Sequence, residues 1–227
     1  MATSLLAVSA LVFLATTRKA ATPAPEVPVK VDLADVRARA EKGDAQAQNV
    51  LGKAYAKGEG VAQSYTEAAK WYLQAAEQGN AQAQVALGEL HEAGQGVTRD
   101  AADAAKWYRR AADQGFAVAQ YNLAVMYLMG KGVPHDVSEA LKWYRKAADQ
   151  GDSLAQFNLG MRYYEGNAVK ADPVEAYKWL SLAAAQGISD AARAVSELKS
   201  KMTSEQVAEG KQRVISFTPV ATAKPAQ

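Results

Sequence analysis

The chain has 227 residues, with 26 Lys and Arg against 24 Asp and Glu, and it contains no cysteine. The formal net charge of +2 gives no electrostatic reason to expect a nucleic-acid partner, and the lack of cysteine excludes disulfides and thiolate chemistry. Hydrophobic residues make up 49% of the chain, as in an ordinary folded protein, although alanine supplies much of that share.

Residues 1–31 are interpreted as an apolar N-terminal segment followed by a spacer. Leu5–Ala15 is apolar, and Arg18 and Lys19 close the run. The run is too short to span a bilayer comfortably and resembles the core of a signal peptide, although no basic residue precedes it. Three alternatives stay open: export to the periplasm or cell envelope, a retained N-terminal membrane anchor, and a cytoplasmic protein. Thr22–Val31 carries three prolines, which is typical of an extended spacer.

From residue 43 onward the sequence repeats itself with a period of 36 residues. The four copies span residues 43–78, 79–114, 115–150 and 151–186. Two slots that agree in every copy are Ala47, Ala83, Ala119 and Ala155, each followed by Gln, and Leu51, Leu87, Leu123 and Leu159. A period in this range predicts a solenoid. One further slot holds all four tryptophans, for which we expect a structural packing role: Trp71, Trp107, Trp143 and Trp179.

Each copy predicts two helices. The first covers 44–57 in copy one and places Ala47, Leu51 and Tyr55 on one face. A Gly-x-Gly turn follows, and Ala168 replaces the second glycine in copy four, which predicts a slightly different turn there. The second helix opens with a Ser or Asp followed by an acid three positions on, a capping-box pattern. The pairs are Ser64 and Glu67, Asp100 and Asp103, Asp136 and Glu139, and Asp172 and Glu175.

Helical caps are predicted at both ends of the array, because an unpaired terminal repeat would expose its apolar face. Residues 32–42 align with the end of a second helix and predict an N-terminal cap. Residues 187–217 begin like a fifth copy and then lose the pattern, and Thr203 with Gln206 forms another capping box. This stretch predicts a closing helix pair, and 218–227 predicts a loose tail.

The recurring pattern A-Q-x-x-L-G-x-x-Y-x-x-G-x-G-V-x-x-D-x-x-x-A-x-x-W-Y-x-x-A-A resembles the Sel1-like repeat family, a relative of the tetratricopeptide repeats. The resemblance covers residues 43–186, and its few departures are His91, Ala124, Ala168 and Leu180. It implies an all-α, right-handed α/α superhelical solenoid that holds another protein. It also implies that the chain is not a catalyst. We further expect a monomeric array without a cofactor.

Ser196 and Lys199 match S-x-x-K, the nucleophile motif of penicillin-recognising enzymes. A cysteine-rich branch of the family is linked to β-lactams, so a β-lactam-interacting or hydrolysing protein is the alternative in another class. The disulfide framework of that branch is missing here, as are the partner motifs S-D-N and K-T-G. An exposed serine and lysine on a capping helix is the plainer interpretation.

The remaining candidates for chemistry are weak. His91 and His135 lack the i, i+4 spacing or the acid cluster of a metal site, so we expect no metal. The basic pairs at 109–110 and 145–146 lie on second helices, where a solvated outer face competes with a phosphate contact. We therefore expect no catalytic, cofactor-binding or metal-binding residues.

One stripe of each first helix faces away from Ala47, Leu51 and their equivalents, and it changes character along the chain. It is largely polar in copies one and two: Gln46, Asn49, Lys53, Ala56, Lys57, then Gln82, Val85, Glu89, Glu92, Ala93. It is largely apolar in copies three and four: Val118, Tyr121, Val125, Leu128, Met129, then Leu154, Phe157, Met161, Tyr164, Glu165. Resemblance to tetratricopeptide repeats places this stripe in the concave groove. Either it binds a peptide or helix of a partner protein, or neighbouring helices bury it.

The sequence thus predicts a non-catalytic scaffold or adaptor of the bacterial cell envelope. Its partner is another protein, held along the groove, and no nucleic acid. A regulator of an envelope signalling protein is a further alternative, which differs from a scaffold only in its partner.

Overall fold

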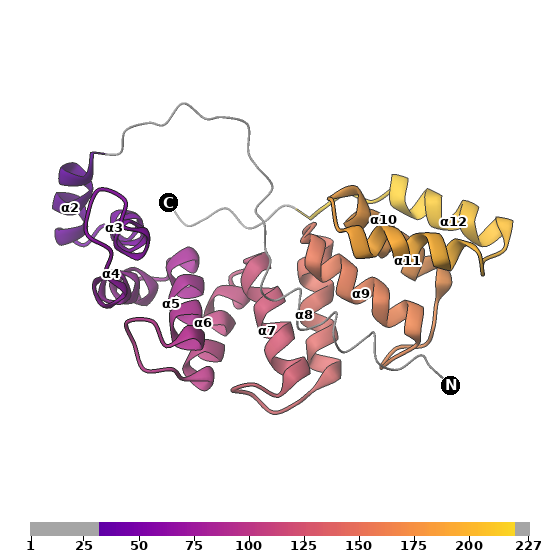
Figure 1. Ribbon diagram of the computed structural model, residues 1–227, viewed down its shortest axis with the longest axis horizontal. Helices are drawn as coiled ribbons and strands as arrows, with labels where there is room; N and C mark the ends of the chain where they lie inside the picture. The colour runs from indigo at the N-terminus through magenta and orange to yellow at the C-terminus, as the bar shows by residue number, and fades with distance from the viewer. Residues whose placement is uncertain (1–31, 221–227) are drawn as a thin grey trace. The chain divides into compact units, whose positions relative to one another are not determined.

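The computed structural model describes residues 32–220, in which eleven α-helices follow one another without a strand (Figure 1). The predictions for the apolar segment and spacer in 1–31, and for 221–227 of the tail, lie outside the described residues. The helices are α2 (Leu33–Glu41), α3 (Ala45–Lys57), α4 (Tyr65–Glu77), α5 (Ala81–Ala93), α6 (Ala101–Asp113), α7 (Ala117–Met129), α8 (Val137–Asp149), α9 (Ser153–Glu165), α10 (Pro173–Ala185), α11 (Ser189–Lys199) and α12 (Ser204–Ile215).

The helices pack in chain order. The pairs α3–α4, α5–α6, α7–α8 and α9–α10 are the four repeats, and the second helix of each also packs against the first helix of the next. Helix α2 covers α3 at one end, while α11 and α12 both pack on α10 at the other. The predicted all-α array of four helix pairs with helical caps is confirmed.

The second helices begin where the sequence predicts, because a side-chain oxygen satisfies free N–H groups of the first turn. These N-caps are Ser64, Asp100, Asp136 and Asp172. The acids three positions on take other partners: Glu67, Asp103 and Glu139 each accept a hydrogen bond from the lysine three residues later. A reciprocal capping box is formed at Thr203 and Gln206.

Glycine is favoured at the second position of the Gly-x-Gly turns for two reasons, both of which Gly132 shows. Gly132 has a φ of 71°, in the left-handed region that side chains disfavour. An added Cβ there would also lie 2.1 Å from the carbonyl oxygen of Ala101, at the start of the preceding repeat's α6. Ala168 keeps the same conformation with a φ of 64°, so the expected difference in the fourth turn does not extend to the backbone.

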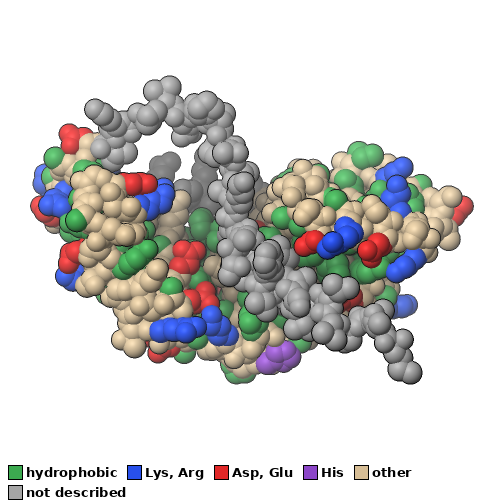
Figure 2. Space-filling model, viewed as in Figure 1, with side chains coloured by type: hydrophobic (Ala, Val, Ile, Leu, Met, Phe, Trp, Pro, Cys, Tyr) green, Lys and Arg blue, Asp and Glu red, His purple; other side chains and the backbone are tan. Residues whose placement is uncertain are grey.

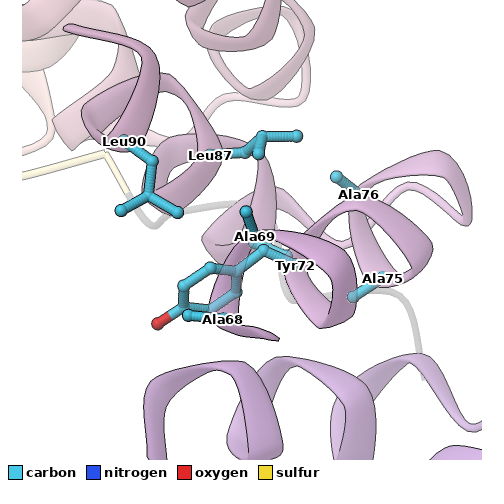
Figure 3. Packing of buried hydrophobic residues seen from close by; sticks show 8 residues of the cluster. Ala68, Ala69, Tyr72, Ala75, Ala76, Leu87 and Leu90 are labelled. Carbon is cyan, nitrogen blue, oxygen red and sulfur yellow. The ribbon is translucent and has the colours of Figure 1, made fainter. Parts of the chain in front are cut away.

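Small and aromatic residues form the core between neighbouring helices. At the junction of repeats one and two, Ala68, Ala75 and Tyr72 of α4 are buried beside Leu87 and Leu90 of α5 (Figure 3). The helical glycines make room for the rings: an added Cβ at Gly52 would lie 2.7 Å from the Tyr72 ring. Alanine and glycine thus let neighbouring helices approach until a single ring fills the space between them.

A ladder of buried glutamines joins one repeat to the next. In the third repeat, Gln120 Nε2 donates to the Ala112 carbonyl at 3.2 Å, and Gln120 Oε1 accepts from Gln150 Nε2 at 2.7 Å. The same two bonds recur around Gln48, Gln84 and Gln156. Each glutamine donates to a carbonyl in the last turn of the preceding helix, which otherwise accepts only from the backbone of the turn that follows, as the Ala112 carbonyl does from the Gly115 N–H at 2.9 Å.

The tryptophans do not share one environment, in contrast to the single packing role expected from the sequence. Trp143 and Trp179 are buried, whereas Trp71 and Trp107 are half-buried. The residue after each tryptophan is the one that is buried in all four repeats: Tyr72, Tyr108, Tyr144 and Leu180.

The C-terminal tail packs back onto the array as far as it is described. The Phe217 ring meets the Trp179 ring edge-on, with centroids 5.6 Å apart. The Val220 amide donates to the Asp149 carbonyl at 2.8 Å. Phe217 is therefore held against the fourth repeat, and Val220 of the predicted loose tail is held against the end of the third.

Candidate protein-binding face

The structure divides the predicted stripe of repeats three and four into buried and accessible residues. Tyr121, Leu154 and Phe157 are only 6%, 6% and 5% exposed. These three side chains are core residues, so the prediction that they line an open groove needs correction. The six other apolar residues form what we call the first-helix stripe: Val118, Val125, Leu128 and Met129 on α7, and Met161 and Tyr164 on α9.

Stacking of the repeats explains the burial of Tyr121 and Phe157. Their slot holds Asn49 in the first repeat, and Asn49 is also buried, with its Nδ2 donating to Gln82 Oε1 of the next first helix at 3.1 Å. Tyr121 packs against Tyr144, with ring centroids 5.8 Å apart. This slot faces the adjacent helices in every copy, which an isolated helical projection does not reveal.

The first-helix stripe itself stays accessible. Met129 is 55% exposed, and the other five members are half-buried. One of its slots, that of Val125 and Met161, carries an exposed charged group in each of the first two repeats, Lys53 and Glu89. The repeat therefore folds with either chemistry at these positions, and apolar side chains there are not required for stacking.

Charged groups adjoin both ends of the first-helix stripe. Lys131, two residues after Met129, reaches back to Glu92 Oε1 at 2.7 Å, and Glu92 Oε2 accepts from the Tyr108 hydroxyl at 2.8 Å. Burial raises the pKa of Tyr108, and the neighbouring Glu92 raises it further. At the other end, Lys201 Nζ donates to the Tyr164 hydroxyl at 2.7 Å.

The remaining candidates lie apart from this face. Ser196 and Lys199 are exposed on α11, and the Ser196 hydroxyl donates to the Ala192 carbonyl of its own helix at 3.1 Å. This is an ordinary helical back-bond and does not activate the hydroxyl as a nucleophile. His91 Nδ1 lies 3.3 Å from the Thr98 carbonyl oxygen. Within residues 32–220, no three His, Asp or Glu side chains are placed to hold a metal ion.

The basic pairs on the second helices take a role that sequence reasoning missed. Arg109 and Arg145 reach into the next repeat and stack on its aromatic rings. They are half-buried, which differs from both the solvated face and the phosphate contact considered from the sequence. The sequence did contain a sign of this role, because Arg109 and Arg145 lie 36 residues apart and therefore occupy the same slot of the repeat. Elsewhere Lys and Arg alternate with Asp and Glu over the visible face (Figure 2).

The Sel1 repeat model matches residues 45–80, 81–116, 117–152 and 153–188. The chain belongs to the Sel1 repeat family. Sel1 repeat proteins generally act as non-catalytic scaffolds that bind other proteins. The right-handed α/α solenoid predicted from the sequence is the fold of this family. The β-lactam alternative receives no support.

Solved structures of Sel1 repeat proteins are similar to this chain. The protective antigen c5321 of uropathogenic Escherichia coli is 35% identical over 81% of this chain, with a TM-score of 0.71. This chain covers 40% of c5321. A Sel1 repeat protein from Oxalobacter formigenes is 32% identical, with a TM-score of 0.70, and the match covers 83% of this chain and 79% of that one.

A more distant neighbour shares the fold alone. The immunity protein Pa5087 of Pseudomonas aeruginosa is 18% identical, with a TM-score of 0.50, and the match covers 85% of this chain and 74% of that one. No curated protein sequence is similar enough to this chain to count as a match. Among the helices in residues 32–220, none combines the length and apolar character needed to cross a membrane.

Proposed function

We propose that this Sel1 repeat protein is an adaptor that binds a peptide or helix of a partner protein on its first-helix stripe. One observation carries the proposal. Val125 and Met161 are apolar and half-buried in a slot that is charged and exposed in the first two repeats, as Lys53 and Glu89. Since the array tolerates charge in this slot, its own packing does not account for the change to apolar side chains.

The chemistry of the first-helix stripe suits a protein segment. Met129 and Met161 are flexible and polarisable, so they adapt to the shape of an apolar ligand. Tyr164 supplies a ring of the kind that is enriched where binding energy concentrates in interfaces. Lys131 and Lys201 lie at the two ends, near Met129 and Tyr164 respectively. An apolar segment with acidic flanks would complement this surface.

The compartment is part of the proposal. The apolar run Leu5–Ala15 followed by a proline-rich spacer supports a place in the cell envelope, either exported or N-terminally anchored. A regulator of an envelope signalling protein would use the same face, since it differs from a scaffold only in its partner. Mass measurement of the mature N-terminus distinguishes a cleaved from a retained segment, and an intact N-terminus in a cytoplasmic fraction contradicts the envelope assignment.

The test places in one slot of repeats three and four the residues that repeats one and two carry there. In the double variant Val125→Lys/Met161→Glu, the slot regains the charges found at 53 and 89. A photo-crosslinking residue placed at Met129 in the otherwise native chain is expected to trap one partner from envelope extract. The double variant, with the same crosslinker, is expected to lose about 90% of that product, because charge replaces the apolar contact.

Two controls make the result decisive. A crosslinker at Lys57, in the slot of Met129 in the first repeat, is expected to give no such product. The thermal midpoint of the double variant is expected to stay within about 2 °C of the parent, because the first two repeats carry Lys53 and Glu89 in the same slot. An undiminished product in the double variant contradicts the proposal.

A further inference from the structure

Two arginines hold the same position between aromatic rings of the following repeat. The Arg109 Cζ lies 5.4 Å from the ring centroid of Tyr127 and 5.1 Å from that of Trp143. Arg109 also donates a hydrogen bond to the Tyr127 hydroxyl. We call such a pair of rings from one repeat, placed around a cation from the repeat before it, an aromatic bracket. Its spacing is that of favourable cation–π contacts.

The same bracket recurs one repeat later. The Arg145 Cζ lies 5.6 Å from the Tyr163 ring centroid and 5.4 Å from that of Trp179, and Arg145 donates to the Tyr163 hydroxyl. At the N-terminal cap, Arg37 of α2 donates to the Tyr55 hydroxyl at 2.7 Å, so the arginine–tyrosine pair is already present there. Arginine therefore fills this slot at three junctions of the array.

The junction between the first and second repeats departs from this pattern at both positions. Leu73 stands in the arginine slot and His91 stands in the tyrosine slot, while Trp107 is kept. A leucine side chain ends at its Cδ atoms and lacks the guanidinium group that an arginine carries beyond its Cδ, so Leu73 places no cation between the two rings. Leu73 is 40% exposed, and Trp107 is half-buried.

The Trp107 ring consequently has fewer partners than its equivalents. Trp143 has a cation from the preceding repeat, Arg109, and a second from its own helix, Lys146, whose Nζ lies 4.0 Å from its centroid. Among residues 32–220, the Trp107 ring contacts a cation only from its own helix, Arg110, whose Cζ lies 4.5 Å from the ring centroid. One side of the His91–Trp107 bracket therefore lacks the cation that the chain supplies to the next two brackets.

Negative charge adjoins this bracket. Asp103 occupies the slot in which Glu139 accepts the Trp143 indole N–H at 3.1 Å, one turn before the tryptophan. The pKa of Asp103 is held below its ordinary value, first by the hydrogen bond from Lys106 and to a smaller extent by the nearby His91. The carboxylate is thus close to His91 and on the same helix face as Trp107. A cation entering the bracket would gain its attraction.

We propose that an arginine side chain of a partner protein enters the His91–Trp107 bracket. It would occupy the place that Arg109 and Arg145 occupy within the chain. Arginine fits better than lysine because its planar guanidinium stacks on two rings at once and is more weakly hydrated. This site uses none of the residues of the first-helix stripe, so a test of one proposal does not decide the other.

The test follows the indole N–H signals of the four tryptophans by NMR in the full chain, at pH 8. The probe is a blocked Gly-Ser peptide with one central arginine, and the control peptide carries lysine instead. The arginine peptide is expected to shift the Trp107 signal saturably, with a Kd on the order of millimolar. The Trp143 and Trp179 signals stay in place, because their brackets are already filled. The lysine peptide binds about 3-fold or more weakly.

Two double variants decide the outcome. Leu73→Arg/His91→Tyr fills the bracket from within and is expected to abolish the Trp107 shift. Arg109→Leu/Tyr127→His empties the next bracket and is expected to transfer the response to Trp143. A Trp107 shift that persists in the first variant, or no shift in the native chain up to about ten times the expected Kd, would overturn the proposal. The first variant alone is sufficient if the second does not fold.

Discussion

Equivalent residues of the repeats show how one neighbour changes the energetics of a buried group. The Tyr108 hydroxyl donates to Glu92 at 2.8 Å. The Tyr144 hydroxyl, 36 residues later, is buried without a hydrogen-bond partner among the described residues. The slot of Glu92 is occupied by Leu128 in that repeat, which removes the acceptor. An apolar first-helix stripe thus leaves one hydroxyl unsatisfied in the core below it.

This difference predicts opposite outcomes for one substitution. Tyr144→Phe removes an unpaired buried hydroxyl and is expected to leave the free energy of unfolding unchanged or to raise it by up to about 1 kcal/mol. Tyr108→Phe removes a bond to a carboxylate and is expected to lower that free energy by about 1–3 kcal/mol. Urea unfolding followed by circular dichroism measures both. Equal losses in the two variants would mean that Tyr144 has a partner.

At the scale of the helix, the glutamine ladder links each first helix to the second helices before and after it. Gln120 is buried, donates to the Ala112 carbonyl and accepts from Gln150. The Gln120 amide therefore bonds to the end of α6 in the preceding repeat and to the residue that ends α8 in its own repeat. Alanine-rich faces bring the helices close together, and the glutamines fix their relative position along the array.

Breaking one step of the ladder is expected to be costly. Gln120→Ala removes two buried hydrogen bonds, leaves the Gln150 amide with only a 3.4 Å bond to the Lys146 carbonyl, and opens a small cavity, for a loss of about 2–4 kcal/mol. Gln63→Ala is the control, because Gln63 is exposed although its Nε2 also donates to a backbone carbonyl, at 2.9 Å. That change is expected to cost about 0.5 kcal/mol or less. Equal urea midpoints for the two variants would show that the ladder contributes little.

For the whole array, buried tyrosines are expected to lower the stability of the fold at alkaline pH. Burial raises the pKa of Tyr72 to about 12, and it also raises the pKa values of Tyr108 and Tyr144. The folded chain holds these phenol protons more tightly than the unfolded chain, in which a tyrosine ionises near about pH 10. Their contribution to stability is therefore complete below about pH 10 and is lost as the pH rises towards about 12.

The expected measurement is a fall of the urea midpoint above about pH 10, accompanied by tyrosinate absorbance that appears together with unfolding. Tyr72→Phe is expected to make this fall less steep, because one linked proton is removed. A midpoint that stays constant from about pH 9.5 to 11.5 would show that the phenols are not protected by the fold.

Much of this architecture is decided by the sequence itself. The 36-residue period, the N-caps such as Asp100 and the glycine turns such as Gly132 predict the helix pairs and their boundaries. These features act within one helix or one turn, where spacing determines which groups meet. The same period identified the caps at both ends, because the pattern fades where a stacking neighbour is missing.

Only the tertiary structure decided which side chains remain accessible. Tyr121 and Phe157 share a helix face with Val125 and Met161, yet the first two are buried by the adjacent helices and the last two are not. The arginine brackets depend likewise on residues 18 and 34 positions apart, as in Arg109 with Tyr127 and Trp143. A helical projection fixes direction within one helix. The distance to the neighbouring helices, which determines burial and stacking, is set by the packing of the whole array.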